Sequence, residues 1–338
     1  MTEELIRLEH GGGGKLMRQL LEDVVIPSFT LQKVEGGAGL LEEDDGAVIP
    51  LGDGYLVMTT DSYTIKPIFF PGGDIGRLAI AGTINDLVVM GAKPIALTSA
   101  VVLEEGFPVY QLKRILNSMN QTLIEVGIPS VAGDTKVVEK GELDNLIITT
   151  AGIGYTSVPV FDSGLNPGDR IIVTGPIGIH EMALLSKREG LKFETTLKSD
   201  VAPLWSIVEP ALKAGKITAM KDPTRGGVAA TLNEMARKSQ VDITVWEEIV
   251  PIEGEVRGVA EMLGLDLFEA ANEGIIVMGV PNEDVENVFK AVKSTKYGSK
   301  AGIIGEVGKG EGLVLIETSA GGKRIMEEPI GSPLPRIC

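Results

Sequence analysis

Short runs of β-branched and apolar residues alternate with segments of helical periodicity along most of this sequence. The run at 55–63 ends in polar residues, which predicts a buried strand, and apolar residues recur at helical intervals across 76–91. The same patterns predict strands at 95–103, 130–132, 146–154, 170–175 and 275–280 and helices at 112–126, 181–186, 201–214 and 228–237. The sequence therefore predicts an α/β (α+β) fold.

The length of the chain indicates two domains, because 338 residues exceed the size at which a single core usually stops growing. We place the boundary between them near 155–159. The expected segments are a glycine-rich N-terminal segment at 1–42, an N-terminal domain at 43–156, a C-terminal α/β domain at 157–322 and a flexible tail at 323–338.

The tail is expected to be extended. Pro329, Pro333 and Pro335 exclude a regular helix there and remove donors that a strand would need. Its 16 residues could span up to about 50 Å, which is enough to reach from a domain surface into a cleft.

The net charge of the chain argues against two classes of function. A formal net charge of -16 disfavours binding to nucleic acid or to an anionic membrane, because both need clustered lysine and arginine. Residues 1–10 lack the apolar core of a signal peptide, and no segment reaches the roughly 18 apolar residues of a membrane span. We therefore expect a soluble, cytoplasmic protein.

One cysteine cannot form an internal disulfide, nor can it build a Cys/His zinc site with only two histidines.

Aspartates gather at the predicted strand ends and loops. They are Asp44, Asp45, Asp61, Asp86, Asp134 and Asp222. Carboxylates around a nucleotide suit Mg²⁺, a hard cation that takes oxygen ligands and keeps water and phosphate oxygens as well. Any one of these aspartates could instead cap a helix or make a turn. Together they favour a site for magnesium-ATP.

Four glycines stand between His10 and Lys15. Consecutive glycines let backbone amides approach a phosphate closely. The spacing is not that of a Walker A motif, because Glu9 stands where its first glycine is needed and Leu16 follows the lysine. The run is either a flexible phosphate lid or a plain linker.

Two further side chains are candidates for catalysis. Lys136 could place positive charge on transferring phosphate oxygens, or it could be an ordinary solvated lysine. Glu273 precedes an apolar strand and could be a general base if burial raises its pKa, although a glutamate at a turn is usually structural.

The single cysteine is the last residue, Cys338. A thiolate is the nucleophilic form of cysteine, and on a proline-stiffened arm it could visit two active sites as a carrier group must. The alternative is an incidental surface thiol. A prenylation signal does not explain it, because that signal needs the cysteine four residues from the end.

Five groups of residues are spread over most of the chain in a pattern shared with a known family. They are Asp45-Gly46-Ala47, Thr60-Asp61-Ser62, Asn85-Asp86-Leu87 with Met90-Gly91-Ala92, Gly133-Asp134-Thr135, and Asp222-Pro223-Thr224-Arg225-Gly226-Gly227. With them the chain resembles the ATP-using enzymes related to aminoimidazole ribonucleotide synthetase, selenophosphate synthetase and thiamine monophosphate kinase. The resemblance implies a two-domain PurM-like fold and a homodimer whose N-terminal domains pair their sheets.

The resemblance also implies an ATP site in a cleft bordered by both domains, with the glycine run folded over the phosphates. The implied Mg²⁺ ligands are Asp45, Asp61, Asp86 and Asp222, and the implied nucleotide contacts also include Asp134, Thr224, Gly12 and Gly13.

Within that family, the ending Pro335-Arg336-Ile337-Cys338, the glycine run and Gly133-Asp134-Thr135-Lys136 resemble the HypE group of hydrogenase maturation proteins. This implies ATP-dependent dehydration of an S-carboxamide on Cys338 to an S-cyanate, which supplies the cyanide ligand for the iron of nickel-iron hydrogenase. Lys136 would then contact the phosphoryl or amide oxygen, and Glu273 would remove protons. The implied partners are HypF, which loads the carbamoyl group, and the HypC-HypD complex, which accepts cyanide.

Two alternatives stay open. One is a kinase or synthetase of the same superfamily that phosphorylates a free small molecule. Selenophosphate synthetase would be expected to carry a reactive cysteine or selenocysteine near the glycine run, and this run has none. The other is a non-catalytic maturation scaffold in which Cys338 holds iron or a partner.

Overall fold

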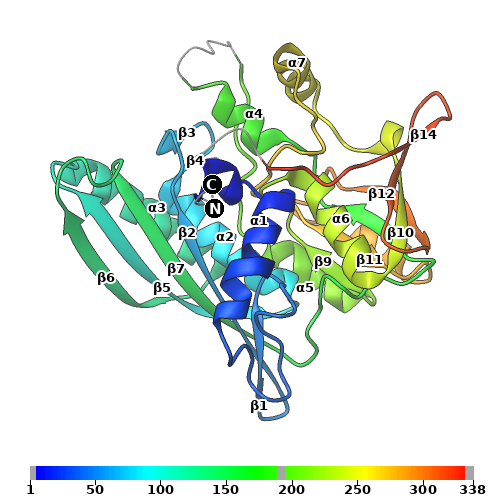
Figure 1. The fold of residues 1–338 in the computed structure, drawn as a ribbon, viewed down its shortest axis with the longest axis horizontal. Helices are drawn as coiled ribbons and strands as arrows, with labels where there is room; N and C mark the ends of the chain where they lie inside the picture. Colours follow the sequence, from blue (N-terminus) through cyan, green and yellow to red (C-terminus); the bar gives the residue numbers. More distant parts are fainter. Residues whose placement is uncertain (1–4, 189–194, 332–338) are drawn as a thin grey trace.

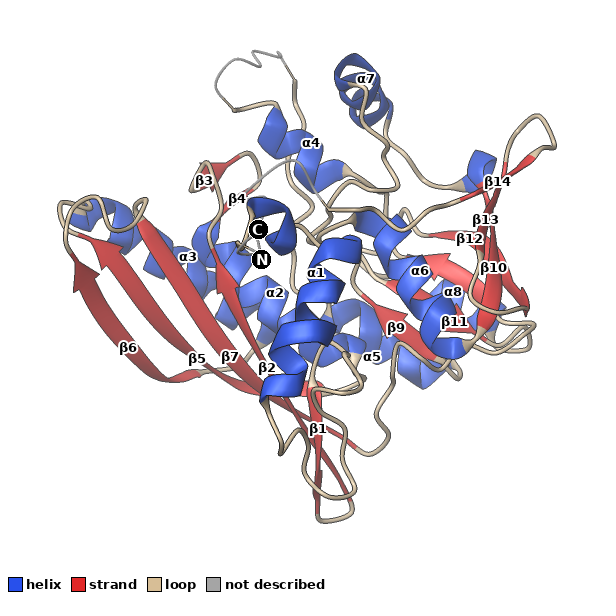
Figure 2. Ribbon diagram, viewed as in Figure 1, coloured by secondary structure: helices blue, strands red, loops and turns tan. Residues whose placement is uncertain are grey.

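The N-terminal domain is built on a five-stranded sheet (Figure 1, Figure 2). The computed structural model describes residues 5–188 and 195–331. The elements of this domain are β1 (Ala47–Leu51), β2 (Gly54–Tyr63), β3 (Phe69–Phe70), β4 (Gly73–Asp74), α2 (Ile75–Val89), β5 (Lys93–Glu104), α3 (Val109–Val126), β6 (Ser130–Val138) and β7 (Leu146–Thr156). The strand order is β1-β2-β7-β5-β6, with β5 and β6 parallel and the other neighbours antiparallel; β3 and β4 form a separate hairpin.

The C-terminal domain is built on a seven-stranded sheet. Its elements are β8 (Arg170–Val173), α4 (Ile179–Leu185), α5 (Trp205–Ala214), β9 (Ala219–Lys221), α6 (Gly227–Ser239), β10 (Val241–Trp246), η4 (Glu247–Ile249), α7 (Gly254–Leu263), β11 (Val277–Val280), α8 (Val285–Lys293), β12 (Gly302–Lys309), β13 (Val314–Glu317) and β14 (Lys323–Ile325). The strand order is β14-β13-β10-β12-β8-β11-β9, and the pair β10 and β13 is parallel.

Helix α2 is apolar on nearly every side. All of its residues except Arg77 and Asp86 are buried. A helix of this kind is stable only between other layers, and α2 packs against the N-terminal sheet, α3 and α5. The Asp74 side chain caps it by accepting hydrogen bonds from the N–H groups of Gly76 and Arg77. The helix therefore holds Asp86 at the junction of the two domains.

The two domains share one hydrophobic core, which includes Ile84 of α2 and Ile207 of α5. Beside it, the buried Asn85 side chain donates to the Ala202 carbonyl and accepts the N–H of Leu204. Rotation of one domain against the other would break these bonds and leave buried polar groups unpaired. The walls of any site between the domains are thus held in a fixed relation.

The N-terminal segment is largely helical and lies beside the C-terminal tail. It comprises η1 (Leu8–Gly11), α1 (Gly14–Leu20), η2 (Leu21–Val25) and η3 (Ile26–Ser28). The backbone N–H groups of Lys15 and Leu16 donate to the carbonyls of Pro329 and Ile330. Arg18 forms a two-pronged ion pair with Glu328 at 3.2 and 3.0 Å.

The first part of the tail is therefore anchored, whereas the sequence predicts a free arm from residue 323. Strand β14 pairs with β13, and the following residues bind α1. Pro329 lacks an N–H but keeps its carbonyl, which accepts a hydrogen bond from one of the unpaired N–H groups at the start of α1. Pro333, Pro335 and Cys338 lie outside the described residues.

Most predicted elements are confirmed with small shifts at their ends, and two differ more. Strand β6 continues to Val138, because its whole length pairs with β5. Helix α5 begins at Trp205 rather than at residue 201, since Pro203 disfavours helical backbone at Ala202, whose N–H instead bonds the Glu273 carbonyl. Within the described residues, we find no helix whose length and apolarity would let it cross a membrane.

Candidate active site

Three aspartates from different elements converge where the two domains meet. Asp45 precedes β1, Asp86 lies on α2 and Asp222 follows β9, and one carboxylate oxygen of each lies within 4.8 Å of the others. They border a cavity of about 150 Å³, here named the acidic cavity. Its lining residues are Asp45, Asp61, Ser62, Tyr63, Gly82, Asp86, Asp222, Thr224, Arg225 and Glu273.

Strand alternation explains how β2 contributes to this cavity. Thr59, Asp61 and Tyr63 lie on the face of β2 that packs against α2. The Thr59 hydroxyl donates to Asp86 over 2.8 Å, and the Tyr63 hydroxyl donates to Asp61 over 2.9 Å. Each carboxylate is therefore oriented through one of its oxygens.

Burial dominates the electrostatics of the cluster. It raises the pKa of Asp86 well above its usual range and that of Asp222 to about 8, and nearby carboxylates add to both shifts. Burial also raises the pKa of Asp61. The Oδ2 atom of Asp45 is buried and has no hydrogen-bond partner among the described residues. Crowded carboxylates with an unpaired oxygen fit a divalent cation that prefers oxygen ligands.

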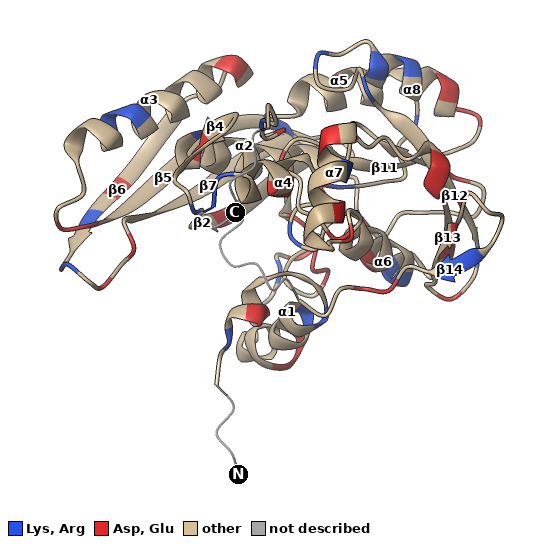
Figure 3. Cartoon of the chain, turned by 90° about the horizontal axis from the view of Figure 1, so that it is seen from above, with Lys and Arg blue, Asp and Glu red and all other residues tan. Residues whose placement is uncertain are grey.

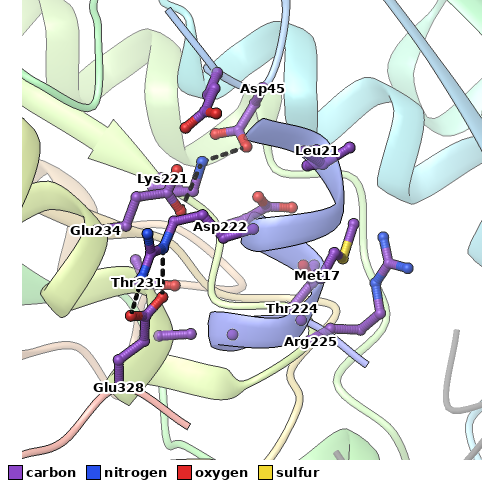
Figure 4. A pocket seen from close by; sticks show the side chains of 15 residues that line it. Met17, Leu21, Asp45, Lys221, Asp222, Thr224, Arg225, Thr231, Glu234 and Glu328 are labelled. Atoms are coloured by element: carbon purple, nitrogen blue, oxygen red, sulfur yellow. Dashed lines mark hydrogen bonds and ion pairs between the residues drawn. The ribbon is translucent and has the colours of Figure 1, made fainter. Parts of the chain in front are cut away.

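A second cavity, of about 200 Å³, adjoins the acidic one (Figure 4). We name it the helix cavity, because α1 and η2 form one of its walls. It shares Asp45, Asp222, Thr224 and Arg225 with the acidic cavity. The rest of its lining is Gly13, Gly14, Met17, Arg18, Leu21, Glu43, Lys221, Ala230, Thr231, Glu234 and Glu328.

Two glycines, one in the lining of the helix cavity and one at the start of α6, allow close approaches of the backbone. Gly227 has a φ of 60°, and a side chain there would lie 2.5 Å from the Phe268 carbonyl oxygen. Gly13 has a φ of 77°, and a Cβ atom would lie 2.7 Å from the Arg225 carbonyl oxygen. Both positions require glycine. Of the two glycines predicted to contact nucleotide, Gly13 lines the cavity and Gly12 does not.

Two lysines of the C-terminal domain offset part of the negative charge. The Lys221 Nζ atom lies 2.7 Å from Asp45, 3.3 Å from Asp162 and 3.7 Å from Glu234. The Lys238 Nζ atom lies 2.8 Å from Asp162 and 2.8 Å from Glu234. Burial acts to lower the pKa of Lys221, but the carboxylates, Asp45 foremost, raise it well above its usual range. Lys221 is therefore a permanent cation.

Glu273 lines the acidic cavity from the loop before β11. Its side chain is buried, and Oε1 has no hydrogen-bond partner within the described part of the chain. Burial raises its pKa well above the usual range, and Asp222 and Asp200 add to the effect. The Glu273 N–H donates to the Asp200 carboxylate at 3.2 and 3.3 Å, and burial raises the pKa of Asp200 to about 7.

Asp134 and Lys136 lie apart from both cavities. They form an ion pair of 3.2 Å on the edge strand β6, with side chains 60% and 69% exposed. The strand register aligns Asp134, through β5 and β7, with Ser62. Strands β7 and β5 therefore separate Asp134 from β2 by about 14 Å, at roughly 4.8 Å between neighbouring strands. Within one chain, therefore, Asp134 and Lys136 are not brought to the acidic cavity.

Known proteins are similar to this chain over nearly its whole length. The AIR synthase related protein family matches through its N-terminal domain at 43–156 and its C-terminal domain at 166–317. A putative hydrogenase expression/formation protein of Methanocaldococcus jannaschii is 48% identical over 332 residues, which cover 97% of this chain and 98% of that protein. Carbamoyl dehydratase HypE of Rhizobium leguminosarum bv. viciae is 43% identical over 338 residues, covering 98% and 95%. The chain belongs to the HypE family.

Solved structures of HypE proteins have the same fold. The crystal structure of a HypE-HypF complex matches with a TM-score of 0.85 at 43% identity, covering 92% of this chain and 99% of that one. HypE in complex with ATP matches with a TM-score of 0.82 at 38% identity, covering 99% and 100%. The predicted PurM-like α/β fold is thereby confirmed.

The sequence pointed to the acidic residues of this HypE-family site, to Gly13 and to Thr224, but gave no role to several other residues that line it. Lys221 carried a weak signal, since a lysine directly before Asp222 at a strand end places a cation beside a carboxylate. Arg225 belongs to a recognised motif that indicates no role for it. Met17 and Leu21 carried no signal, because only the packing of α1 against the C-terminal domain brings them to the helix cavity.

Replacing Asp200 by asparagine should change the pH dependence of stability. The raised pKa, from 3.8 to about 7, means that the folded protein binds this proton more tightly than the unfolded chain does. The resulting stabilisation is complete below about pH 4 and is lost as the pH rises through about 7. In metal-free buffer, the melting temperature of Asp200→Asn relative to the unsubstituted protein should therefore increase over that range.

Asp53→Asn, which changes an exposed carboxyl between β1 and β2, is the control and should keep the original pH profile. A difference between Asp200→Asn and the unsubstituted protein that stays constant with pH would contradict the assignment.

Proposed function

We propose that the protein uses ATP to dehydrate an S-carboxamide on Cys338 to an S-cyanate, which supplies the cyanide ligand for the iron of nickel-iron hydrogenase. The observation that carries this proposal is the meeting of three features at one place. The acidic cavity, the helix cavity and the anchored base of the tail adjoin one another, and Glu328 of the tail lines the helix cavity. The names of the relatives, among them carbamoyl dehydratase HypE, support it.

ATP would lie across the two cavities. Met17, Leu21 and Ala230 offer apolar contacts for the base in the helix cavity. The phosphates would then extend toward the acidic cavity, where carboxylates would repel them without a cation. The solved complex of a HypE relative with ATP supports a nucleotide site in this fold.

Mg²⁺ fits the acidic residues. Asp45, Asp86 and Asp222 present ligand atoms within 4.8 Å of one another, and the Asp45 Oδ2 atom is buried with no partner among the described residues. Asp61 lines the same cavity and would complete the set. When bound, the cation would neutralise negative charge on the transferring phosphoryl group.

The chemistry requires a better leaving group than an amide oxygen. Attack of the carboxamide oxygen on the γ-phosphorus forms a C–O–P link and releases ADP, and the nitrogen loses one proton. Cleavage of the C–O bond then expels phosphate, and loss of the second nitrogen proton leaves a C≡N group on sulfur. The carboxamide thus gives up the atoms of one water, its oxygen leaving within the phosphate.

Glu273 is suited to accept the nitrogen protons. It lines the acidic cavity, and its Oε1 atom has no partner within the described residues. A carboxylate whose pKa is raised by burial is a stronger base once it is ionised. Arg225 lines the same cavity and acts to lower that pKa, which favours the ionised form.

The tether of Cys338 starts beside the site. Pro329 lies against Gly14, which lines the helix cavity, and the described chain ends at Gly331. Residues 332–338 can span at most about 23 Å. A thiol on so short a tether serves a site near α1, and the acidic cavity shares four lining residues with the helix cavity there.

Lys136 fits the reaction as a contribution from a second copy of the chain. In Figure 3, α3 covers one face of the N-terminal sheet, and β6 is an exposed edge strand. Val131 and Val137 are 62% and 66% exposed on it. A homodimer that pairs the N-terminal sheets would cover this edge, which would otherwise attract other strands. Lys136, with its ion-pair partner Asp134, would then reach the neighbouring acidic cavity and place its ammonium on the phosphoryl or amide oxygen.

The proposed partners are HypF, which would load the carbamoyl group, and the HypC-HypD complex, which would accept cyanide. A HypE relative has been solved in complex with HypF, which supports the first of these. The need for ATP favours the cytoplasm as the place of reaction.

The dehydration itself can be tested by intact-protein mass spectrometry. The protein is loaded with HypF, carbamoyl phosphate and ATP, the adduct is isolated, and magnesium-ATP is then added. We expect the modification on Cys338 to lose the mass of one water, and Cys338→Ser to form no such product. A cysteine that never accepts carbamoyl would favour phosphorylation of a free small molecule, and an adduct that keeps its water would favour a scaffold.

Glu273→Gln should lower the single-turnover rate of dehydration by about 10²- to 10⁴-fold, because the proton acceptor is lost. ATP binding should persist, since the substitution removes a charge without changing size. Glu269→Gln, which changes an exposed carboxyl in the same loop, is the matched control and should react at the original rate. A rate that survives Glu273→Gln removes this residue from the mechanism.

Mixing two inactive variants tests the contribution from a second copy. If each site combines Glu273 of one chain with Lys136 of the other, a mixture of Lys136→Ala and Glu273→Gln should regain activity through mixed dimers. Each variant alone should be nearly inactive, and one site of a mixed dimer would have both intact side chains. A mixture no more active than its components, with mixed dimers verified by mass, would place both residues within one chain. High activity of Lys136→Ala alone would remove Lys136 from the mechanism.

A further inference from the structure

We propose that Lys221 is a positioning residue for the metal site, holding one oxygen of Asp45 so that the other oxygen faces the cation. The inference rests on the proposed function, because it presumes a divalent cation at Asp45, Asp86 and Asp222. Lys221 itself would touch neither the cation nor the nucleotide phosphates.

The two oxygens of the Asp45 carboxylate have different surroundings. The Lys221 Nζ atom donates to Oδ1 over 2.7 Å, whereas Oδ2 is buried with no partner among the described residues (Figure 4). A charge-assisted hydrogen bond of this length restricts rotation of the carboxylate. Groups that orient a ligand in this way commonly decide metal affinity as strongly as some ligands do.

The position of Lys221 is itself set by both domains. The lysine lies at the end of β9 and is 9% exposed. It also contacts Asp162, in the segment that joins the domains, at 3.3 Å. The Asp44 carboxylate accepts the N–H groups of both Asp45 and Asp162, at 2.9 and 3.1 Å. Asp44 therefore links the backbone of Asp45 to the backbone of Asp162, whose side chain contacts Lys221.

Lys238 offers a matched control within the same network. It is similarly buried and contacts Asp162 and Glu234, as Lys221 does. Its remaining described contact is to the backbone carbonyl of Glu43 at 2.6 Å, not to the Asp45 carboxylate. Loss of Lys238 therefore removes a buried cation from the cluster but leaves the hydrogen bond from Lys221 to Asp45 in place.

The test is a titration of the full-length protein with Mn²⁺, followed by electron paramagnetic resonance, in the presence of a non-hydrolysable ATP analogue. Lys221→Met should weaken Mn²⁺ binding by about 10- to 100-fold, the range typical of lost outer-sphere support. Lys221→Arg, which keeps a cationic donor, should recover most of the affinity. Lys238→Met should bind Mn²⁺ nearly as tightly as the unsubstituted protein. Should Lys221→Met fail to fold, Lys221→Gln takes its place with the same expected loss.

The possible outcomes separate the inference from the proposed function. If the unsubstituted protein binds Mn²⁺ and the Lys221 variants bind it equally well, Lys221 has no positioning role and the metal site stands. If Lys238→Met weakens binding as much as Lys221→Met, the network is only structural and the inference is wrong. If the unsubstituted protein binds no Mn²⁺ beside the nucleotide analogue, the metal site is wrong and the inference falls with it.

Discussion

Carboxylates that are buried together repel one another, and the structure depends on how this repulsion is limited. Asp45, Asp86 and Asp222 come from separate elements, so no local preference of the chain brings them together. The shared apolar core around α2 holds them in place, and the cations of Lys221 and Lys238 offset part of their charge. A bound divalent cation, as proposed above, would remove the remaining repulsion and favour the ionised form of these carboxyl groups.

The helix cavity, where we propose that ATP binds, adjoins the anchored part of the tail. Helix α1 lines the helix cavity through Met17, and the first turn of that helix binds the carbonyls of Pro329 and Ile330. Arg18 reinforces this contact through Glu328, and both of these side chains also line the cavity. A ligand in the helix cavity would therefore lie beside the side chains that anchor the tail at Glu328.

The sequence predicted those features that a local pattern or a motif encodes. The strand at 55–63 was predicted from its β-branched and apolar start, and the helix at 76–91 from apolar residues at helical intervals. Asp45, Asp61, Asp86 and Asp222 were readable as part of recognised motifs. The extension of β6 was not, because Gly133, Asp134 and Lys136 interrupt its apolar residues, although the strand pairs with β5 as far as Val138. The anchoring of the tail was likewise missed, since its partner is more than 300 residues away in α1.

The contrast between Lys221 and Lys136 supports the proposal that a second chain contributes to the site. A lysine beside buried carboxylates forms ion pairs with them, as Lys221 does with Asp45 at 2.7 Å. Its ammonium group is then not available to a substrate oxygen. Lys136 forms an exposed ion pair with Asp134, a contact that costs little to rearrange. Held on an edge strand, it would meet the acidic cavity only across a dimer interface. The Lys136 ammonium could then contact the phosphoryl oxygens without first forming an ion pair with the aspartates proposed to bind the metal.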